Sequence, residues 1–98
     1  MNPVAATILQ QLGGAWRLVM MTGAKDFVDL GNGVRFRIGR NGERINTVAV
    51  TLTPLDTYDV EFSWTTVRGS TPKASFTNIY CDQLVGLFER TTGLYLTL

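Results

Sequence analysis

Apolar and polar side chains alternate in three separate segments of this chain. This period of two residues limits the folds that the chain can adopt. Val34, Phe36 and Ile38 alternate with arginines, and the same spacing recurs over residues 47–53 and 58–64. Successive side chains of a β-strand point to opposite faces of its sheet, so the spacing predicts strands with one buried and one wet face. The buried face would carry Val34, Phe36, Ile38, Val48, Val50, Leu52, Val60, Phe62 and Trp64.

Turn-forming residues separate these segments. Gly31-Asn32-Gly33 precedes the first of them, and Asn41-Gly42, between the first and second, is the strongest short hairpin signal of the chain. Pro54-Leu55-Asp56-Thr57 supplies the next turn, and Arg68 to Pro72 reads as a loop. Such short connections predict an antiparallel meander.

Three further segments are interpreted as strands. Residues 16–21 are rich in apolar side chains but do not show which face is buried, and residues 24–30 follow after a Thr-Gly pair. Residues 73–79 make the last long strand. The meander is therefore predicted to have five to six strands.

A helix is predicted near each end of the chain. Asn2-Pro3 is a helix start, since Asn caps a free backbone N–H and Pro fits the first helical position. Gly13 and Gly14 end this helix, and Gly93 caps a second one over residues 80–92. The apolar faces would carry Val4, Ile8, Leu9 and Leu12 in the first helix and Leu84, Leu87, Phe88 and Thr91 in the second.

These elements predict one α+β domain over residues 1–98. An N-terminal helix, the antiparallel meander and a C-terminal helix follow in order, with the helices covering one sheet face. The segment 94–98 either forms a short edge strand or tucks under the sheet.

Composition excludes several classes of function. The chain has no His, so no imidazole can serve as a base or as a metal ligand. It has one Cys, which excludes a disulfide within the chain and a thiolate zinc cluster. The net charge of +1 gives no overall field that would recruit nucleic acid or an acidic membrane. We expect no cofactor.

The sequence also predicts where the protein works. Its N-terminus lacks the basic and apolar regions of a signal peptide, and no apolar run exceeds four residues, so we expect no membrane association. The single Cys81 fits a reducing compartment, which favours the cytoplasm over a secreted protein without disulfides. Cys81 begins the second helix, where a thiol can become reactive, but with Asp82 beside it and no His base we interpret it as structural.

The wet face of the predicted sheet is its most informative surface. By alternation it carries Arg35 and Arg37 on one strand and Asp59 and Glu61 on another, with a row of threonines between them. Such a face either holds ordinary cross-strand pairs or serves as a binding surface. The threonines are Thr47, Thr51 and Thr53.

Four of the nine basic residues fall within ten positions. Arg35, Arg37, Arg40 and Arg44 form this cluster, and arginines bind phosphate groups bidentately. A site for single-stranded nucleic acid would also need exposed aromatic rings on which bases stack. The candidate rings are Tyr58, Tyr80 and Tyr95, although the alternation turns Tyr58 inward.

Asp56, Asp59 and Glu61 form a small carboxylate cluster. Such a cluster is typical of a divalent-cation site or of a general acid–base pair. A small meander, however, offers little room for a catalytic cleft. The polar residues of an ordinary hairpin explain the same pattern.

Three strings of the sequence are distinctive in their order. These are Met21-Thr22-Gly23-Ala24-Lys25-Asp26-Phe27-Val28, Asp56-Thr57-Tyr58-Asp59-Val60-Glu61-Phe62, and a closing segment from Asp82-Gln83-Leu84 to Gly93-Leu94-Tyr95. From Ile8 onward the chain resembles a group of small uncharacterised proteins carried by phages and other mobile genetic elements. The resemblance implies a small accessory protein of such an element and assigns no catalytic or binding residue.

The leading functional hypothesis is a non-enzymatic binding protein that uses the polar sheet face to contact a host or phage macromolecule. The alternative is a nucleic-acid-binding accessory protein that uses the arginine cluster. The second alternative is a metal-dependent enzyme that uses the carboxylate cluster. Open edge strands would also permit a homodimer.

Overall fold

The computed structural model describes residues 2–96, which form three α-helices, five strands and one short 3₁₀ helix. Each α-helix has eight or nine residues, and none of those in the described part could span a bilayer. In chain order the elements are α1 (Pro3–Gln11), α2 (Ala15–Thr22), β1 (Lys25–Asp29), β2 (Gly33–Arg37), β3 (Thr47–Leu52), β4 (Tyr58–Thr66), β5 (Gly69–Ile79), η1 (Cys81–Gln83) and α3 (Leu84–Thr92).

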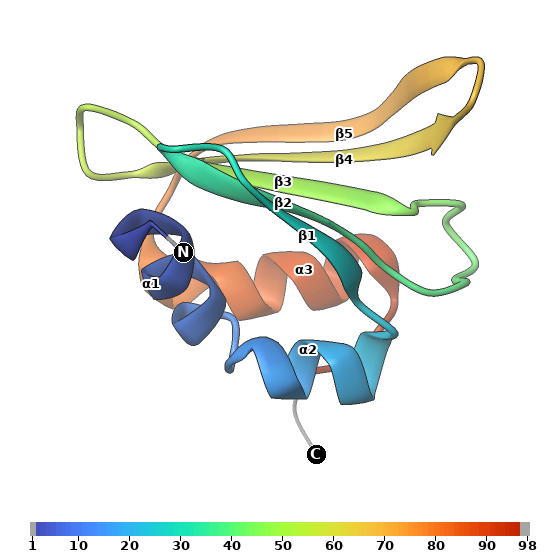
Figure 1. Ribbon diagram of the computed structural model, residues 1–98, viewed down its shortest axis with the longest axis horizontal. Coiled ribbons are helices and arrows are strands. Elements are labelled where there is room, and N and C mark those ends of the chain that lie inside the picture. Colours follow the sequence, from blue (N-terminus) through green and yellow to red (C-terminus); the bar gives the residue numbers. More distant parts are fainter. Residues whose placement is uncertain (1, 97–98) are drawn as a thin grey trace.

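The strands form one antiparallel sheet in sequence order, β1-β2-β3-β4-β5, as a meander should. All three α-helices lie on one side of this sheet and leave its other side open (Figure 1). The predicted α+β architecture is confirmed.

The core lies between the helices and the covered sheet face. Phe36 and Phe62 are fully buried on β2 and β4, and the Phe62 ring lies 6.5 Å from that of Phe88 on α3. Of the nine side chains expected to face the core, seven are buried, whereas Leu52 and Trp64 are half-buried. The helical faces were predicted almost correctly, with Thr92 buried in place of Thr91.

The prediction of a strand at residues 16–21 is wrong, because this segment belongs to α2. The helix begins after Gly14 and ends at Gly23, which adopts the left-handed conformation (φ 70°) of a helix C-cap. Leu18 and Thr22, four residues apart, are its buried positions. Only two buried positions in eight residues give too short a pattern to separate a helix from a strand.

Two strand boundaries also differ from the prediction. β5 begins at Gly69, so most of the segment read as a loop at residues 68–72 is paired with β4. The end of the chain forms no strand up to residue 96; Leu96 is buried and its N–H donates to the Glu89 carboxylate at 2.8 Å. The rest of that predicted segment, residues 97–98, lies outside the described residues.

Gly33 provides a sharp test of the β2–β3 register. A Cβ atom on Gly33 would lie 2.1 Å from the Val50 carbonyl oxygen and 2.7 Å from the Thr51 Cα, so both strands would have to separate. We expect Gly33→Ala to lower the free energy of unfolding by about 3 kcal/mol, measured by urea denaturation. Gly42→Ala is the matched control, because a Cβ there has no neighbour within 4 Å and should change stability by less than about 0.5 kcal/mol. Equal stabilities of the two variants would contradict this register.

Candidate functional site

The open face of the sheet carries the predicted arginine and carboxylate side chains. Arg35 and Arg37 are exposed on β2, and Glu61 is exposed on β4. Ala49 of β3 lies between Arg35 and Glu61 in the strand register, so no threonine separates them. These residues line one shallow hollow of about 460 Å³ on the open face.

The expected row of three exposed threonines is only partly present. Thr47 lies in register between Arg37 and Ser63, but it is buried, and its hydroxyl donates to the Asn46 side chain at 2.9 Å. Thr51 is half-buried beside Asp59, and Thr53 lies beyond the end of β3. Side chains on the two adjacent strands cover a small residue between them, and alternation by itself does not reveal this.

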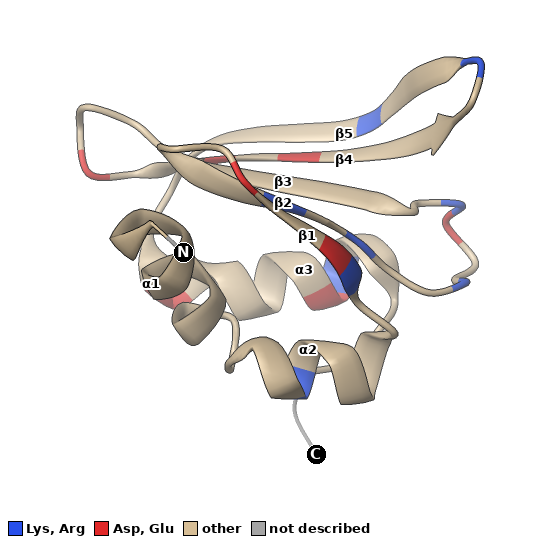
Figure 2. Cartoon of the chain, viewed as in Figure 1, with Lys and Arg blue, Asp and Glu red and all other residues tan. Residues whose placement is uncertain are grey.

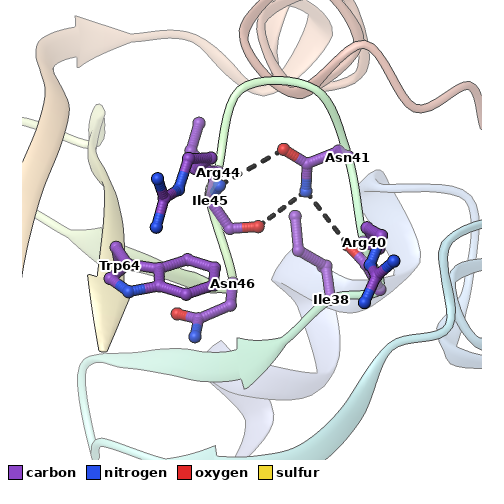
Figure 3. Close-up of a pocket in the computed structure, with 8 residues that line it drawn as sticks. Ile38, Arg40, Asn41, Arg44, Ile45, Asn46 and Trp64 are labelled. Carbon is purple, nitrogen blue, oxygen red and sulfur yellow. Dashed lines mark hydrogen bonds between the residues drawn. The ribbon is translucent and has the colours of Figure 1, made fainter. Parts of the chain in front are cut away.

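Arg40 and Arg44 lie in the segment that joins β2 to β3. The Asn41-Gly42 pair predicted a tight hairpin, but this connection runs over residues 38–46 and is held by the Asn41 side chain. The Asn41 amide donates to the Gly39 and Ile45 carbonyl oxygens at 3.0 and 2.6 Å, and its oxygen accepts from the Ile45 N–H (Figure 3). The same oxygen also accepts from the Glu43 N–H. The loop is therefore preorganised by one side chain, and both arginines project from it exposed.

Asn46 fixes this loop against β4. Its side chain donates to the Thr65 carbonyl oxygen and accepts from the Thr65 N–H, both at 2.8 Å. The backbone N–H of Asn46 donates to the Ser63 carbonyl oxygen. Trp64, between these two partners, is thereby held beside the loop. The guanidinium carbon of Arg44 lies 5.3 Å from the centre of the Trp64 ring, a cation–π contact (Figure 3).

Trp64 is the functional candidate that sequence reasoning missed. Alternation correctly placed it on the side of the sheet that bears the helices, where it was interpreted as core. It is only half-buried and lines a hollow with Ile38, Ile45 and the two loop arginines. Alternation gives the side of a sheet on which a residue lies, but not how far the covering helices reach.

Three hollows adjoin one another at this end of the sheet. The open-face hollow and a second one share Arg37 and Thr65, and the second shares Asn46 and Trp64 with the loop hollow. Neighbouring hollows therefore follow one another from the open face, around the end of the sheet, to the loop. We call the arginines and the tryptophan that line them the basic track: Arg35, Arg37, Trp64, Arg40 and Arg44.

Charge is unevenly distributed along the strands (Figure 2). Seven of the nine lysines and arginines lie on the sheet or in its connections, whereas Arg17 and Arg90 lie on α2 and α3. Asp29, Asp56 and Asp59 lie at or near the opposite end of the strands from the loop arginines. Asp26 and Glu43 are the acidic side chains near the loop end.

No family model, curated protein or solved structure matches the chain.

The carboxylate cluster is not assembled as a cation site. Asp59 is half-buried on β4 and Glu61 is exposed two residues along, whereas Asp56 lies in the β3–β4 turn with a left-handed backbone (φ 61°). Among residues 2–96 no three His, Cys, Asp or Glu side chains gather closely enough to hold a metal ion.

Two groups with a shifted pKa lie away from the basic track. Hydrogen bonds from the Gly31 and Asn2 N–H groups lower the pKa of Asp29. Desolvation raises the pKa of Tyr58, whose hydroxyl donates to Gln11 at 2.7 Å. Both contacts tie α1 and the β1–β2 turn to the sheet, which is a structural role.

The tyrosines considered as stacking rings lie elsewhere. Tyr58 is buried, as the alternation predicted. Tyr80 and Tyr95 are exposed, but they flank η1 and α3 rather than the arginine cluster. The aromatic ring next to these arginines is that of Trp64.

Proposed function

We propose that this protein is a small non-enzymatic binding protein and that the macromolecule it binds is nucleic acid. The observation that carries the proposal is the basic track, in which four exposed arginines and one half-buried tryptophan line three neighbouring hollows. Phosphate groups would contact the arginines, which lie on the open face and on the loop at the end of the sheet. Such a role suits a cytoplasmic accessory protein of a mobile element.

The arginines of the track are available for phosphate. Arg35, Arg37, Arg40 and Arg44 are all exposed, and within residues 2–96 none forms an ion pair with a carboxylate. A guanidinium group that is not engaged by a carboxylate can donate two parallel hydrogen bonds to one phosphate. Asp29, Asp56 and Asp59 lie at or near the other end of the strands, whereas Asp26, Glu43 and Glu61 share the hollow or the loop with these arginines without forming an ion pair with them.

A protein partner on the open face is the second candidate. Glu61 and Asp26 line the same hollow as Arg35 and Arg37, and such mixed charge suits a protein surface. Tight protein interfaces also centre on a large apolar or aromatic anchor. Ala49 is too small for that role, and Val28 and Leu30, which line the same hollow, are of residue types that seldom serve as such anchors, so we favour nucleic acid.

Self-association through an edge strand remains a hypothesis. β1 and β5 are the two edges of the sheet. β5 carries Pro72 and Lys73, and both residue types discourage pairing of edge strands. We therefore do not assign the binding function to a dimer.

A titration at several salt concentrations tests the proposal. We expect the full chain to bind a labelled mixed-sequence oligonucleotide at low ionic strength, with affinity falling steeply as salt rises. Four phosphate contacts on a single strand predict a slope of log K against log salt of about −3. Fluorescence anisotropy measures both quantities.

Two outcomes would reject the proposal. One is the absence of binding to any oligonucleotide at the lowest salt. The other is binding whose affinity does not change with salt, since phosphate contacts must release counterions.

A further inference from the structure

We infer that the hollow between Trp64 and the Gly39–Asn46 loop receives one unstacked nucleobase, so that the ligand is single-stranded nucleic acid. This inference rests on the proposed function and names the class of nucleic acid. It follows from the shape of the hollow, from the Trp64–Arg44 contact and from the hydrogen bonds that the loop already uses.

The hollow has the size and lining of a site for a flat aromatic group. Its volume is about 410 Å³, at the small end of ligand pockets, which suits one base and its sugar rather than a base pair. Ile38 and Ile45 are buried and supply an apolar floor. The Trp64 ring forms one wall, and the rest of the lining comes from Gly39, Arg40, Asn41, Arg44 and Asn46 (Figure 3).

Arg44 marks where the base would stack. Its guanidinium lies over the Trp64 ring, 5.3 Å from the ring centre, so a cation already covers the ring face on which a flat base would stack. Guanidinium planes and indole rings both stack on nucleobases. Because the Arg44 side chain is exposed, it is free to swing aside and contact the flanking phosphate while the base packs on Trp64.

The hydrogen bonds of the loop predict little base preference. The Asn41 side chain uses both amide hydrogens and accepts two N–H groups, so it has no capacity left for a base edge. The Asn46 oxygen likewise accepts from Thr65 and Thr47. Binding by stacking alone is tolerant of sequence, because every base has a π-face.

A duplex would be excluded from this contact. Its bases are paired and stacked, and extruding one costs a few kcal/mol. We therefore expect the duplex to use only the arginine contacts, and a single strand to use both the arginines and Trp64.

The two tryptophans of the chain allow a matched spectroscopic test. Trp16 is exposed on α2, away from the basic track, and Trp64 lines the hollow. In Trp16→Phe the only indole is Trp64, and we expect single-stranded DNA to quench its emission. In Trp64→Phe the remaining Trp16 emission should not change.

Affinities measured by anisotropy complete the test. We expect Trp64→Ala to weaken binding of a single strand about 10-fold or more and to leave duplex binding within about 2-fold, as expected for the loss of one stacked base. Trp64→Phe keeps a ring and should retain most of the single-strand affinity, which controls for folding of the alanine variant. Trp16→Ala should alter neither affinity.

The possible failures are distinguishable. If the full chain binds no oligonucleotide at low salt, the proposed function is wrong. If it binds single strands and duplexes equally and Trp64 emission does not change, nucleic-acid binding stands and the base-binding hollow is overturned. A 10-fold loss of affinity for both the single strand and the duplex in Trp64→Ala would also overturn the base-binding hollow, since that result indicates a disturbed surface.

Discussion

Phe62→Ala is expected to lower the free energy of unfolding by about 3–5 kcal/mol, a large part of the total stability of a domain of this size. Phe62 is fully buried on β4, at the contact between the sheet and α3. Its ring lies 6.1 Å from Phe76 and 6.5 Å from Phe88, so its removal leaves a cavity that three elements share.

Urea denaturation followed by circular dichroism measures this loss. Leu55→Ala is a suitable control, because Leu55 is 78% exposed in the β3–β4 turn and should change stability by less than about 0.5 kcal/mol. A loss below about 1 kcal/mol for Phe62→Ala would mean that Phe62 does not lie in the core as described.

Replacing Arg35, Arg37, Arg40 and Arg44 together by Gln is expected to reduce the affinity for single-stranded DNA at low salt by about 100-fold or more. Each arginine lost removes one phosphate contact, which should bring the slope of log K against log salt from about −3 to near zero. The fold should survive, since all four side chains are exposed and none forms an ion pair with a carboxylate within the described residues, so only the Arg44 contact with Trp64 is lost. The melting temperature checks this.

Charge alone must be separated from position in that experiment. Arg17 and Arg90 are exposed on α2 and α3, outside the basic track, so Arg17→Gln with Arg90→Gln changes the net charge without touching the track. At about 0.1 M salt, where the Debye length is about 10 Å, we expect this double variant to bind within about 3-fold of the unaltered chain, because charges farther away than that are screened. Equal losses in the two variants would contradict a localised site.

The pair Arg35 and Arg37 and the pair Arg40 and Arg44 were predictable to different degrees. Strand alternation alone put the first pair on the open face, where the structure places it. The second pair was expected beside a two-residue turn. The loop is longer because the Asn41 side chain replaces the backbone bonds of a tight hairpin, and Asn46 then ties the loop to β4.

The sequence alone determined the α+β class, the meander, the two terminal helices and the inward side of each central strand. These features depend on local periodicity, on caps such as Asn2 and Gly93 and on turn residues, all of which act between near neighbours in the chain. Only the tertiary structure decided that residues 15–22 form a helix, because the burial of Leu18 beneath the sheet depends on contacts far along the chain. The contact between Trp64 and Arg44 was likewise decided only by the tertiary structure. They are 20 positions apart, and the extent of the helices beneath the sheet, rather than any local pattern, leaves that ring accessible.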